Sequence, residues 1–309
     1  MAPNPDRLVV SVSDVNVAAA LRDIDGVDVV VWDMSGPSPV ASIDVLVPPF
    51  LGGSDWITQL SSVRTRLVQS PMLGYDGMAE RLPAGIVYAN AASVHETSTS
   101  ELALALILAL QRGIPDYVRA AERGEWKRGW RESLADRRVL LVGYGGVGRA
   151  IAQRLLPFEV VLTRVAHHER RDEIGEIYGI DALPELLPSA DIVIIAVPLN
   201  DSTTHLVDDA FLSRMSDGSM LVNIARGQVA DTNALVDHAR SGRLRLALDV
   251  TDPEPLPEGH PLFALENVLI SPHVGGATSA AIPRLIHLVK EQIDRLRNGE
   301  EPLNVVIRT

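Results

Sequence analysis

The sequence predicts an α/β protein with two doubly wound domains. Short runs rich in Val, Ile and Leu alternate with helical patterns along the whole chain. Several of these runs are apolar throughout, which is typical of strands buried on both faces of a parallel sheet. The chain has 309 residues, enough for about two domains of ~150 residues each. The alternation of strands and helices therefore favours parallel sheets covered by helices.

The predicted strands are short and rich in aliphatic residues. In the first third of the chain they cover Leu8–Val12, Val27–Trp32, Ile43–Val47, Leu67–Gln69 and Ile86–Ala89. Later they cover Val139–Val142, Val160–Leu162, Ile192–Val197, Met220–Ile224, Leu244–Val250 and Val268–Ile270. The tail, Glu301–Ile307, reads as a further short extended segment.

Two long helices are predicted. The first covers Glu96–Gln111, with Ser and Thr near its start and Gly113-Ile-Pro115 after its end. Its middle is apolar on every side, so we expect it to be buried between two domains or in a subunit interface. The second covers about Ala280–Arg297 and is stopped by Asn298-Gly299. We infer that residues 1–92 and 280–309 form one domain, and that residues 93–279 form the other.

The charge balance excludes two classes of partner. Lys and Arg number 28 against 40 Asp and Glu, which gives a formal net charge of −12. Nucleic acids and anionic membranes both need a positive protein field, so we expect neither as a partner. The chain has no Cys, which excludes disulfides, thiolate metal sites and a Cys nucleophile. We expect no metal site.

The sequence gives no indication of export or membrane insertion. The longest clean apolar run, Leu102–Leu110, is far shorter than the ~20 residues that span a bilayer. Residues Met1–Pro5 have neither the basic start nor the apolar stretch of a secretory signal. The absence of Cys fits a reducing compartment. We therefore expect a cytoplasmic protein.

A glycine-rich turn follows the predicted strand Val139–Val142. Residues 143–148 read Gly-Tyr-Gly-Gly-Val-Gly, and a helical pattern continues to Pro157. This order of strand, glycines and helix is that of a dinucleotide-binding loop. Gly143 permits the tight turn, Gly145 lets the backbone approach the pyrophosphate, and Gly148 lets helix and strand pack closely. The phosphates would face the N–H groups at the start of the helix, so the predicted contacts are Gly143, Gly145, Gly146, Val147 and Gly148.

The segment after the next strand favours NADP over NAD. An NAD site needs a carboxylate at the carboxyl end of this strand, where it accepts hydrogen bonds from the ribose. The strand that starts at Val160 leads instead into Arg164-Val-Ala-His167-His-Glu-Arg-Arg, with no carboxylate directly after it. Arg supplies charge-assisted bonds to a phosphate. We therefore predict NADP as the preferred cofactor and NAD as the alternative, with contacts from Arg164 and His167.

Three further segments each follow a predicted strand. They contain Arg226, then Asp249 with Glu254, then His273. Because ligands bind at the carboxyl ends of the strands in open α/β sheets, we expect these side chains to converge. Hydride transfer to a ketone leaves a developing alkoxide, and a His is the natural proton donor near neutral pH. A nearby carboxylate favours the charged His, and an Arg fork binds a substrate carboxylate and polarises the carbonyl.

These segments resemble motifs of the D-isomer-specific 2-hydroxyacid dehydrogenase family, in particular its glyoxylate/hydroxypyruvate reductases. The late motifs are matched by Asn223–Gly227, by Leu248–Leu256 and by Ser271–Gly276. The nucleotide loop is matched by residues 143–148, and Ser93–Leu104 resembles the interdomain helix. The resemblance covers nearly the whole chain. It implies a flavodoxin-like substrate domain, a Rossmann NAD(P)-binding domain and a homodimer joined through the nucleotide domains.

The resemblance also implies roles for individual residues. Arg226 binds the substrate, His273 is the acid/base, and Glu254 orients and charges His273. Asp249 holds the nicotinamide carboxamide, and the backbone of Leu73 and Gly74 cradles the substrate carboxylate. Further cofactor contacts are expected from Pro198, Ile224 and Ala225. The substrate is then a small 2-keto acid, reduced to a D-2-hydroxy acid.

The sequence departs from the family pattern at one informative position. The ribose-binding Asp that is common in the family falls at Ala166 here, which supports NADP. Two other functions stay open at this point. One is formate or phosphite oxidation on the same fold, although formate has no hydroxyl proton for a Glu–His pair to remove. The other is a non-catalytic, dinucleotide-sensing co-regulator. The identity of the 2-hydroxy acid, the direction of the reaction and the oligomeric state are not determined by the sequence.

Overall fold

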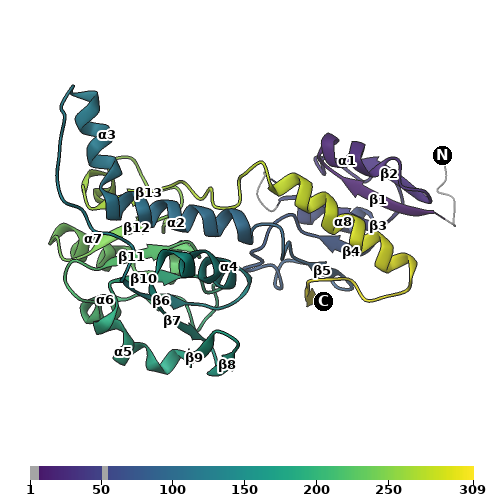
Figure 1. Ribbon diagram of the computed structural model, residues 1–309. Helices are drawn as coiled ribbons and strands as arrows, with labels where there is room; N and C mark the ends of the chain where they lie inside the picture. Colours follow the sequence, from purple (N-terminus) through teal and green to yellow (C-terminus); the bar gives the residue numbers. More distant parts are fainter. Residues whose placement is uncertain (1–6, 51–54) are drawn as a thin grey trace. The chain divides into compact units, whose positions relative to one another are not determined.

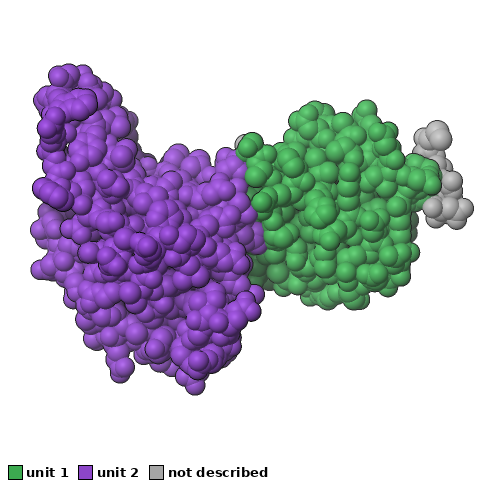
Figure 2. All heavy atoms as spheres, viewed as in Figure 1, with its two compact units in different colours: residues 1–95, 279–309 green, residues 96–278 purple. Residues whose placement is uncertain are grey.

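The computed structural model describes residues 7–50 and 55–309. Residues 1–5, which gave no indication of a secretory signal, lie outside the described part. The chain divides into two compact units, residues 1–95 with 279–309 and residues 96–278 (Figure 2). The boundaries expected from the sequence fall after residues 92 and 279. Each unit has its own sheet (Figure 1).

The first unit contains a six-stranded sheet in the order β14-β5-β4-β3-β1-β2. Strands β1 to β5 pair in parallel, and β14 pairs antiparallel with β5. The sheet packs against α1 and α8 through one cluster of buried aliphatic side chains. The elements are β1 Leu8–Val12, α1 Val15–Leu21, β2 Val27–Val31, β3 Ser42–Val47, β4 Arg64–Gln69, β5 Val87–Ala89, α8 Ala281–Arg297 and β14 Val305–Arg308, with a 3-10 helix at Asp55–Ser62.

The second unit contains an eight-stranded sheet in the order β13-β12-β11-β10-β6-β7-β9-β8. All neighbours are parallel except β8 and β9, which form an antiparallel hairpin. The strands are β6 Arg138–Val142, β7 Val161–Ala166, β8 Arg170–Asp172, β9 Gly175–Gly179, β10 Ile192–Ile195, β11 Met220–Asn223, β12 Arg245–Leu248 and β13 Val268–Ile270. The helices are α2 Glu96–Arg112, α3 Ile114–Glu122, α4 Gly146–Leu155, α5 Leu183–Leu186, α6 Asp209–Arg214 and α7 Thr232–Arg240.

Strand β6 shows why the predicted strands read as continuous apolar runs. Val139 and Leu141 pack into the cluster that contains α2 and α4, on one face of the sheet. Leu140 and Val142 pack into the cluster on the other face, with α6 and α7. Successive side chains of a strand point to opposite faces, so a strand covered on both sides must be apolar at every position. The α/β architecture with parallel sheets is therefore confirmed.

The structure corrects the sequence analysis at two places. Strand β7 does not end before Arg164 but continues to Ala166. The hairpin of β8 and β9 was not predicted, because its residues are largely polar and follow no apolar alternation. In the single chain, Ala105 of helix α2 is exposed and Leu102 and Leu108 are half-buried, so the expected burial of this helix in a subunit interface stays a prediction. In the described part of the chain, no helix has both the length and the apolar character needed to cross a membrane.

Candidate active site

In the glycine turn between β6 and α4, the first and last glycines pack tightly against the backbone, whereas Gly145 between them faces open space. Gly143 has a φ of +103°, and a Cβ atom there would lie 2.4 Å from the carbonyl oxygen of Ala196. A Cβ at Gly148 would lie 2.1 Å from the carbonyl oxygen of Gly143. At Gly145, by contrast, no heavy atom lies within 4 Å of the Cβ position. Two glycines are thus required by the protein's own packing, whereas Gly145 leaves space beside the backbone.

This open turn fits the phosphates of a dinucleotide. Gly146 and Val147 begin α4, whose first N–H groups have no intrahelical acceptors. A Cβ at Gly146 would lie 2.9 Å from Oε1 of Glu96 on α2, so that side is closed. The turn follows β6, where the strand order reverses between β10 and β7. Such a switch point is where open α/β sheets hold ligands.

The other residues predicted around the cofactor follow neighbouring strands. Ile224 and Ala225 come directly after β11 and are both buried. Pro198 lies beyond the end of β10, and its carbonyl oxygen accepts a hydrogen bond of 2.6 Å from the Thr203 hydroxyl. These three residues therefore lie in segments that leave the same edge of the sheet as the glycine turn.

The end of β7 presents basic side chains and no acid in first position. Ala166 is the last residue of the strand. His167 and His168 follow it, exposed, with their ring centroids 4.3 Å apart. Exposed Arg170, in β8, donates through Nη2 to the carbonyl oxygen of Tyr144 at 3.3 Å. Arg164 is different: it lies within β7 and is only 2% exposed.

His273 lies in the loop that follows β13, and its backbone has a conformation that non-glycine residues rarely adopt. Its φ is +52°, in the left-handed region. Its backbone N–H donates to the carbonyl oxygen of Asp249 at 2.7 Å. Its Nδ1 lies 2.5 Å from Oε1 of Glu254, and the two side chains are 39% and 42% exposed. The structure thus brings together two of the three residues predicted to carry the chemistry.

Asp249 fastens the loop that carries His273. Its carboxylate is buried and accepts hydrogen bonds from the Ser271 hydroxyl at 2.7 Å and from the N–H groups of Val274 at 3.0 Å and Gly275 at 2.9 Å. Sequence reasoning placed Asp249 at the cofactor and did not identify this contact with the loop. Asp249 directly follows β12, and Ser271 directly follows the neighbouring strand β13. An Asp and a Ser at adjacent strand ends are the pattern that could have indicated this hydrogen bond.

Arg226 lies in a turn that is fixed from both sides. The Asn223 side chain accepts from the N–H of Ala225 and donates to the carbonyl oxygen of Arg226, both at 3.0 Å. A Cβ at Gly227 would lie 1.8 Å from the carbonyl oxygen of Thr251. The Arg226 turn therefore packs directly against the segment that leads to Glu254. The half-buried Arg226 side chain donates through Nη1 to the carbonyl oxygen of Ala225 at 2.6 Å.

Leu73 and Gly74, predicted to bind the substrate carboxylate, belong to the first unit, in the loop after β4. That loop is fastened within its own unit. Asn90 donates to the carbonyl oxygen of Leu73 at 2.9 Å. Nε2 of buried His95 lies 2.7 Å from the carbonyl oxygen of Pro71. Both contacts hold the backbone of the loop in place.

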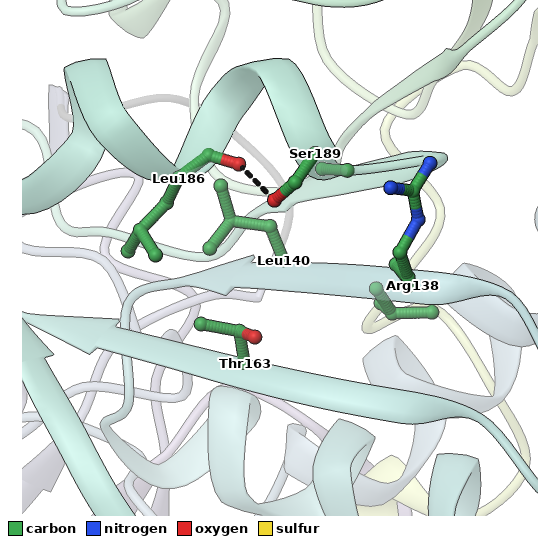
Figure 3. A pocket seen from close by; sticks show the side chains of 7 residues that line it. Arg138, Leu140, Thr163, Leu186 and Ser189 are labelled. Atoms are coloured by element: carbon green, nitrogen blue, oxygen red, sulfur yellow. Dashed lines mark hydrogen bonds between the residues drawn. The ribbon is translucent and has the colours of Figure 1, made fainter.

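A separate hollow lies at the amino end of β6 (Figure 3). It encloses about 190 Å³, part of it open to solvent, and is lined by residues that include Arg138, Thr163 and Ser189. Ligand pockets typically have ~300–1,000 Å³. Because it is small and lies away from the carboxyl ends of the strands, this hollow is not the candidate site. Among the described residues, no group of His, Asp and Glu side chains is arranged to hold a metal ion.

Comparisons with known proteins agree with this geometry. Residues 104–275 match the NAD binding domain of the D-isomer specific 2-hydroxyacid dehydrogenases. The chain is 32% identical over 285 residues to a glyoxylate reductase from Thermococcus onnurineus, covering 87% of this chain and 84% of that protein. It is also 32% identical over 301 residues to a glyoxylate reductase from Pyrococcus furiosus, covering 90% and 89%.

A solved structure is similar over almost its full length. It is a D-isomer specific 2-hydroxyacid dehydrogenase from Xanthobacter autotrophicus Py2 in complex with NADPH and MES. The TM-score is 0.81 and the identity 26%, and the similarity covers 98% of each chain.

Proposed function

The chain belongs to the D-isomer specific 2-hydroxyacid dehydrogenase family and is an NAD(P)-dependent oxidoreductase of 2-keto and 2-hydroxy acids, and from this premise we propose how its own residues do the chemistry. The proposed reaction is the reduction of a small 2-keto acid, of the glyoxylate or hydroxypyruvate class, to the D-2-hydroxy acid. The bound nicotinamide supplies the hydride. The protein orients the substrate, stabilises the developing charge and delivers the proton.

The contact between His273 and Glu254 carries the proposal. Oε1 of Glu254 lies 2.5 Å from Nδ1 of His273, so the carboxylate fixes the ring and leaves Nε2 as the nitrogen that exchanges a proton with the substrate. In the reducing direction the imidazolium gives its proton to the alkoxide oxygen, and in the oxidising direction the neutral ring removes it. The Glu254 carboxylate compensates the positive charge of the imidazolium while the ring holds the proton.

Arg226 is proposed to hold the substrate. A guanidinium can pair with the substrate carboxylate and point a further N–H at the carbonyl oxygen. The bond to that oxygen strengthens as negative charge develops, so it lowers the barrier and does not only tighten binding. The turn that carries Arg226 is fastened by Asn223 and packs on the Thr251 backbone, which fixes the position of its backbone beside the segment that leads to Glu254.

NADPH is proposed as the preferred reductant. The last residue of β7 is Ala166, where an acid would be needed to accept hydrogen bonds from an unmodified ribose. The exposed side chains that follow it include His167 and Arg170, which suit a 2′-phosphate. The neighbouring Glu169 is the one carboxylate between them and would oppose it. The balance of these charges supports NADPH, with Arg170 as the principal cation.

One experiment tests both the reaction and the reductant. A panel of 2-keto acids is assayed by the absorbance of the reduced nicotinamide, with NADPH and NADH in parallel, and the product is analysed for chirality. The proposal predicts D-2-hydroxy acids and a higher kcat/KM with NADPH. Turnover with NADH alone would overturn the cofactor proposal, and an L-product would overturn the proposed arrangement of the substrate. Formate and phosphite are assayed separately with NADP+ and NAD+, because their oxidation would reduce the nicotinamide. The ionisable pair at His273 has no proton to transfer in formate oxidation, so we expect no turnover with formate.

A homodimer is proposed from the exposed apolar surface of the second unit. Helix α3 and the extended segment after it stand apart from the sheet (Figure 1). The exposed fractions are 53% for Val118, 86% for Trp126 and 102% for Trp130. Monomeric proteins rarely expose such large apolar side chains together, and they are typical of interface residues. Light scattering on the wild type and on a Trp126→Ser/Trp130→Ser variant tests it; a monomeric wild type would contradict it.

A further inference from the structure

Arg164 is a buried cation whose guanidinium makes several hydrogen bonds inside the second unit. Its Nη1 donates to the Tyr144 hydroxyl at 2.9 Å and to both carboxylate oxygens of Asp172 at 2.8 Å. Its Nη2 donates to the carbonyl oxygen of Glu176 at 3.3 Å. Its Cζ lies 4.8 Å from the centroid of the Tyr144 ring. The guanidinium therefore joins the glycine turn, which contains Tyr144, to the hairpin of β8 and β9.

Apart from the buried side chain of Ile177, which packs in the cluster that contains Tyr144 and Ala166, the hairpin has few contacts that fix it. Strand β9 pairs with β7 only at Val165 and Ala166, and β8 pairs only with β9. The second direct contact with the glycine turn is the bond from Arg170 to the Tyr144 carbonyl oxygen. Asp172 also accepts hydrogen bonds from the N–H groups of Ile174 and Gly175, at 3.0 and 3.2 Å, and so shapes the hairpin turn. Breaking the ion pair would therefore loosen β8 and the turn at Asp172 relative to the glycine turn, while Ile177 keeps β9 packed on the sheet.

We infer that Arg164, Asp172 and Tyr144 form a latch that positions Arg170 and His167 to recognise the 2′-phosphate of NADPH. In this inference Arg164 is a positioning residue and does not itself touch the cofactor. The inference rests on the NADPH preference proposed above and assigns the structural cause of that preference. Residues that discriminate between cofactors must be held to within a fraction of an ångström, and exposed loop side chains are not held by packing.

The charges around the latch are consistent with this role. The hydrogen bonds from Arg164 lower the pKa of the Asp172 carboxyl below its ordinary value. The pair thus stays ionised at neutral pH. A buried guanidinium that loses its carboxylate is left uncompensated, which is unfavourable. It would then draw the hairpin out of position or admit water. Glu169, Glu173 and Glu176 are the other acids of this region, and all three are exposed.

The test uses Asp172→Asn in the full-length protein. Asn keeps an acceptor oxygen for the turn N–H groups but removes the charge that faces Arg164. Tyr144→Phe is a milder second variant that keeps the ring and removes one acceptor. Glu176→Gln is the matched control, because it breaks the exposed pair of Arg171 and Glu176, 2.6 Å apart, on the same hairpin. Asp172→Glu tests for rescue by a charge of the same sign.

Binding is measured by calorimetry, without substrate, using adenosine 2′,5′-bisphosphate and adenosine 5′-monophosphate as probes. We expect Asp172→Asn to raise the Kd of the bisphosphate about tenfold, as for a displaced binding group. The Kd of the monophosphate should change by less than about twofold, as should both values in Glu176→Gln. Tyr144→Phe should also raise the Kd of the bisphosphate, by a smaller factor. The Kd of the bisphosphate in Asp172→Glu should lie between those of Asp172→Asn and the wild type.

The outcomes separate this inference from the cofactor proposal. A wild type that binds the two probes equally would overturn both. A wild type that prefers the bisphosphate, with Asp172→Asn and Tyr144→Phe unchanged, would overturn the latch alone. An equal loss for both probes together with a lower Tm would show that the ion pair only supports the fold. With NADPH, the expected change lies in KM, while kcat at saturation stays near the wild-type value.

Discussion

Replacing Gly145 and Gly148 by alanine, one at a time, separates cofactor binding from folding in the glycine turn. The same methyl group is added at two positions only three residues apart. At Gly148 it would lie 2.1 Å from a backbone oxygen, whereas at Gly145 it meets no heavy atom within 4 Å. The backbone at Gly145, with φ −85° and ψ −155°, is also accessible to any L-residue. The two variants should therefore fail in different ways.

The magnitudes follow from these distances. A Cβ at 2.1 Å from an oxygen forces α4 away from β6, and overpacking of this kind costs about 1–3 kcal/mol. For a unit of this size a loss of 1 kcal/mol lowers Tm by about 2–4 °C. Gly148→Ala should thus lower Tm by roughly 2–12 °C. Gly145→Ala adds only the small penalty of Ala at a helix N-cap, less than about 1 kcal/mol.

For cofactor binding the order of the two variants is reversed, with the larger effect expected in Gly145→Ala. If the pyrophosphate lies against the backbone of Gly145, a methyl group there displaces it by about the size of that group. We expect KM for NADPH to rise about tenfold or more in Gly145→Ala, which corresponds to ~1.4 kcal/mol. Thermal unfolding with and without NADPH, together with steady-state kinetics, measures both effects. A Gly145→Ala enzyme with unchanged KM would show that the phosphates lie elsewhere, and a fully stable Gly148→Ala protein would refute the packing argument.

The remaining predictions concern the acid/base, the substrate fork, the His loop and one exposed ion pair. His273→Gln should lower kcat by about 10²–10⁴ without a change in Tm; a loss of less than fivefold, roughly, would assign the proton to another group. Arg226→Lys keeps the charge but loses the fork, so both KM and kcat should worsen, with kcat/KM reduced at least about tenfold, and equal kinetics would remove the fork from the mechanism. Asp249→Asn places an amide against N–H donors, so kcat should fall while the KM of NADPH changes less, and the reverse pattern would favour a direct contact with the cofactor. Hydrogen bonds from Arg138 lower the pKa of Asp191, so this ion pair stabilises the fold at neutral pH and ceases to do so as pH falls through that lowered pKa. Asp191→Asn should therefore reduce the free energy of unfolding by about 1 kcal/mol at pH 7 and by progressively less in acid. A difference between variant and wild type that is independent of pH would contradict this.

Most strands of this protein were predictable because a strand buried on both faces is apolar at each position, which is visible in the local sequence. Val139 to Val142 are apolar at each position since each of them faces one of two covered sides of the sheet. The glycine turn was predictable for a related reason. Gly143 and Gly148 occupy places where a Cβ would overlap the backbone, so the chain has no other choice of residue there. Gly145 and its role toward the cofactor remain predictions.

Arg164 shows where such reasoning stops. The strand that starts at Val160 was expected to end before Arg164. Burying an isolated charge is costly, so Arg164 needs a partner to lie inside the strand. The strand instead continues to Ala166, since Asp172 from an unpredicted hairpin neutralises the guanidinium. The partner lies eight residues away, beyond the turn between β7 and β8, and no periodic pattern connects the two.

The sequence by itself thus determined most strands of the two sheets, the glycine turn and the set of residue types for hydride and proton transfer. Each of these depends on short-range rules: side-chain periodicity, the steric limits of glycine, and the chemistry that a His or an Arg can perform. Only the tertiary structure decided that Asp249 fastens the His273 loop and that Arg164 faces inward. It also gave the distance of 2.5 Å between Glu254 and His273, a pair that the family resemblance implied. The contacts of Glu254 and Asp249 join segments from different strand ends, and their geometry depends on how neighbouring strand ends are spaced in the folded sheet. The contact of Arg164 joins a strand to a hairpin that no sequence pattern indicated.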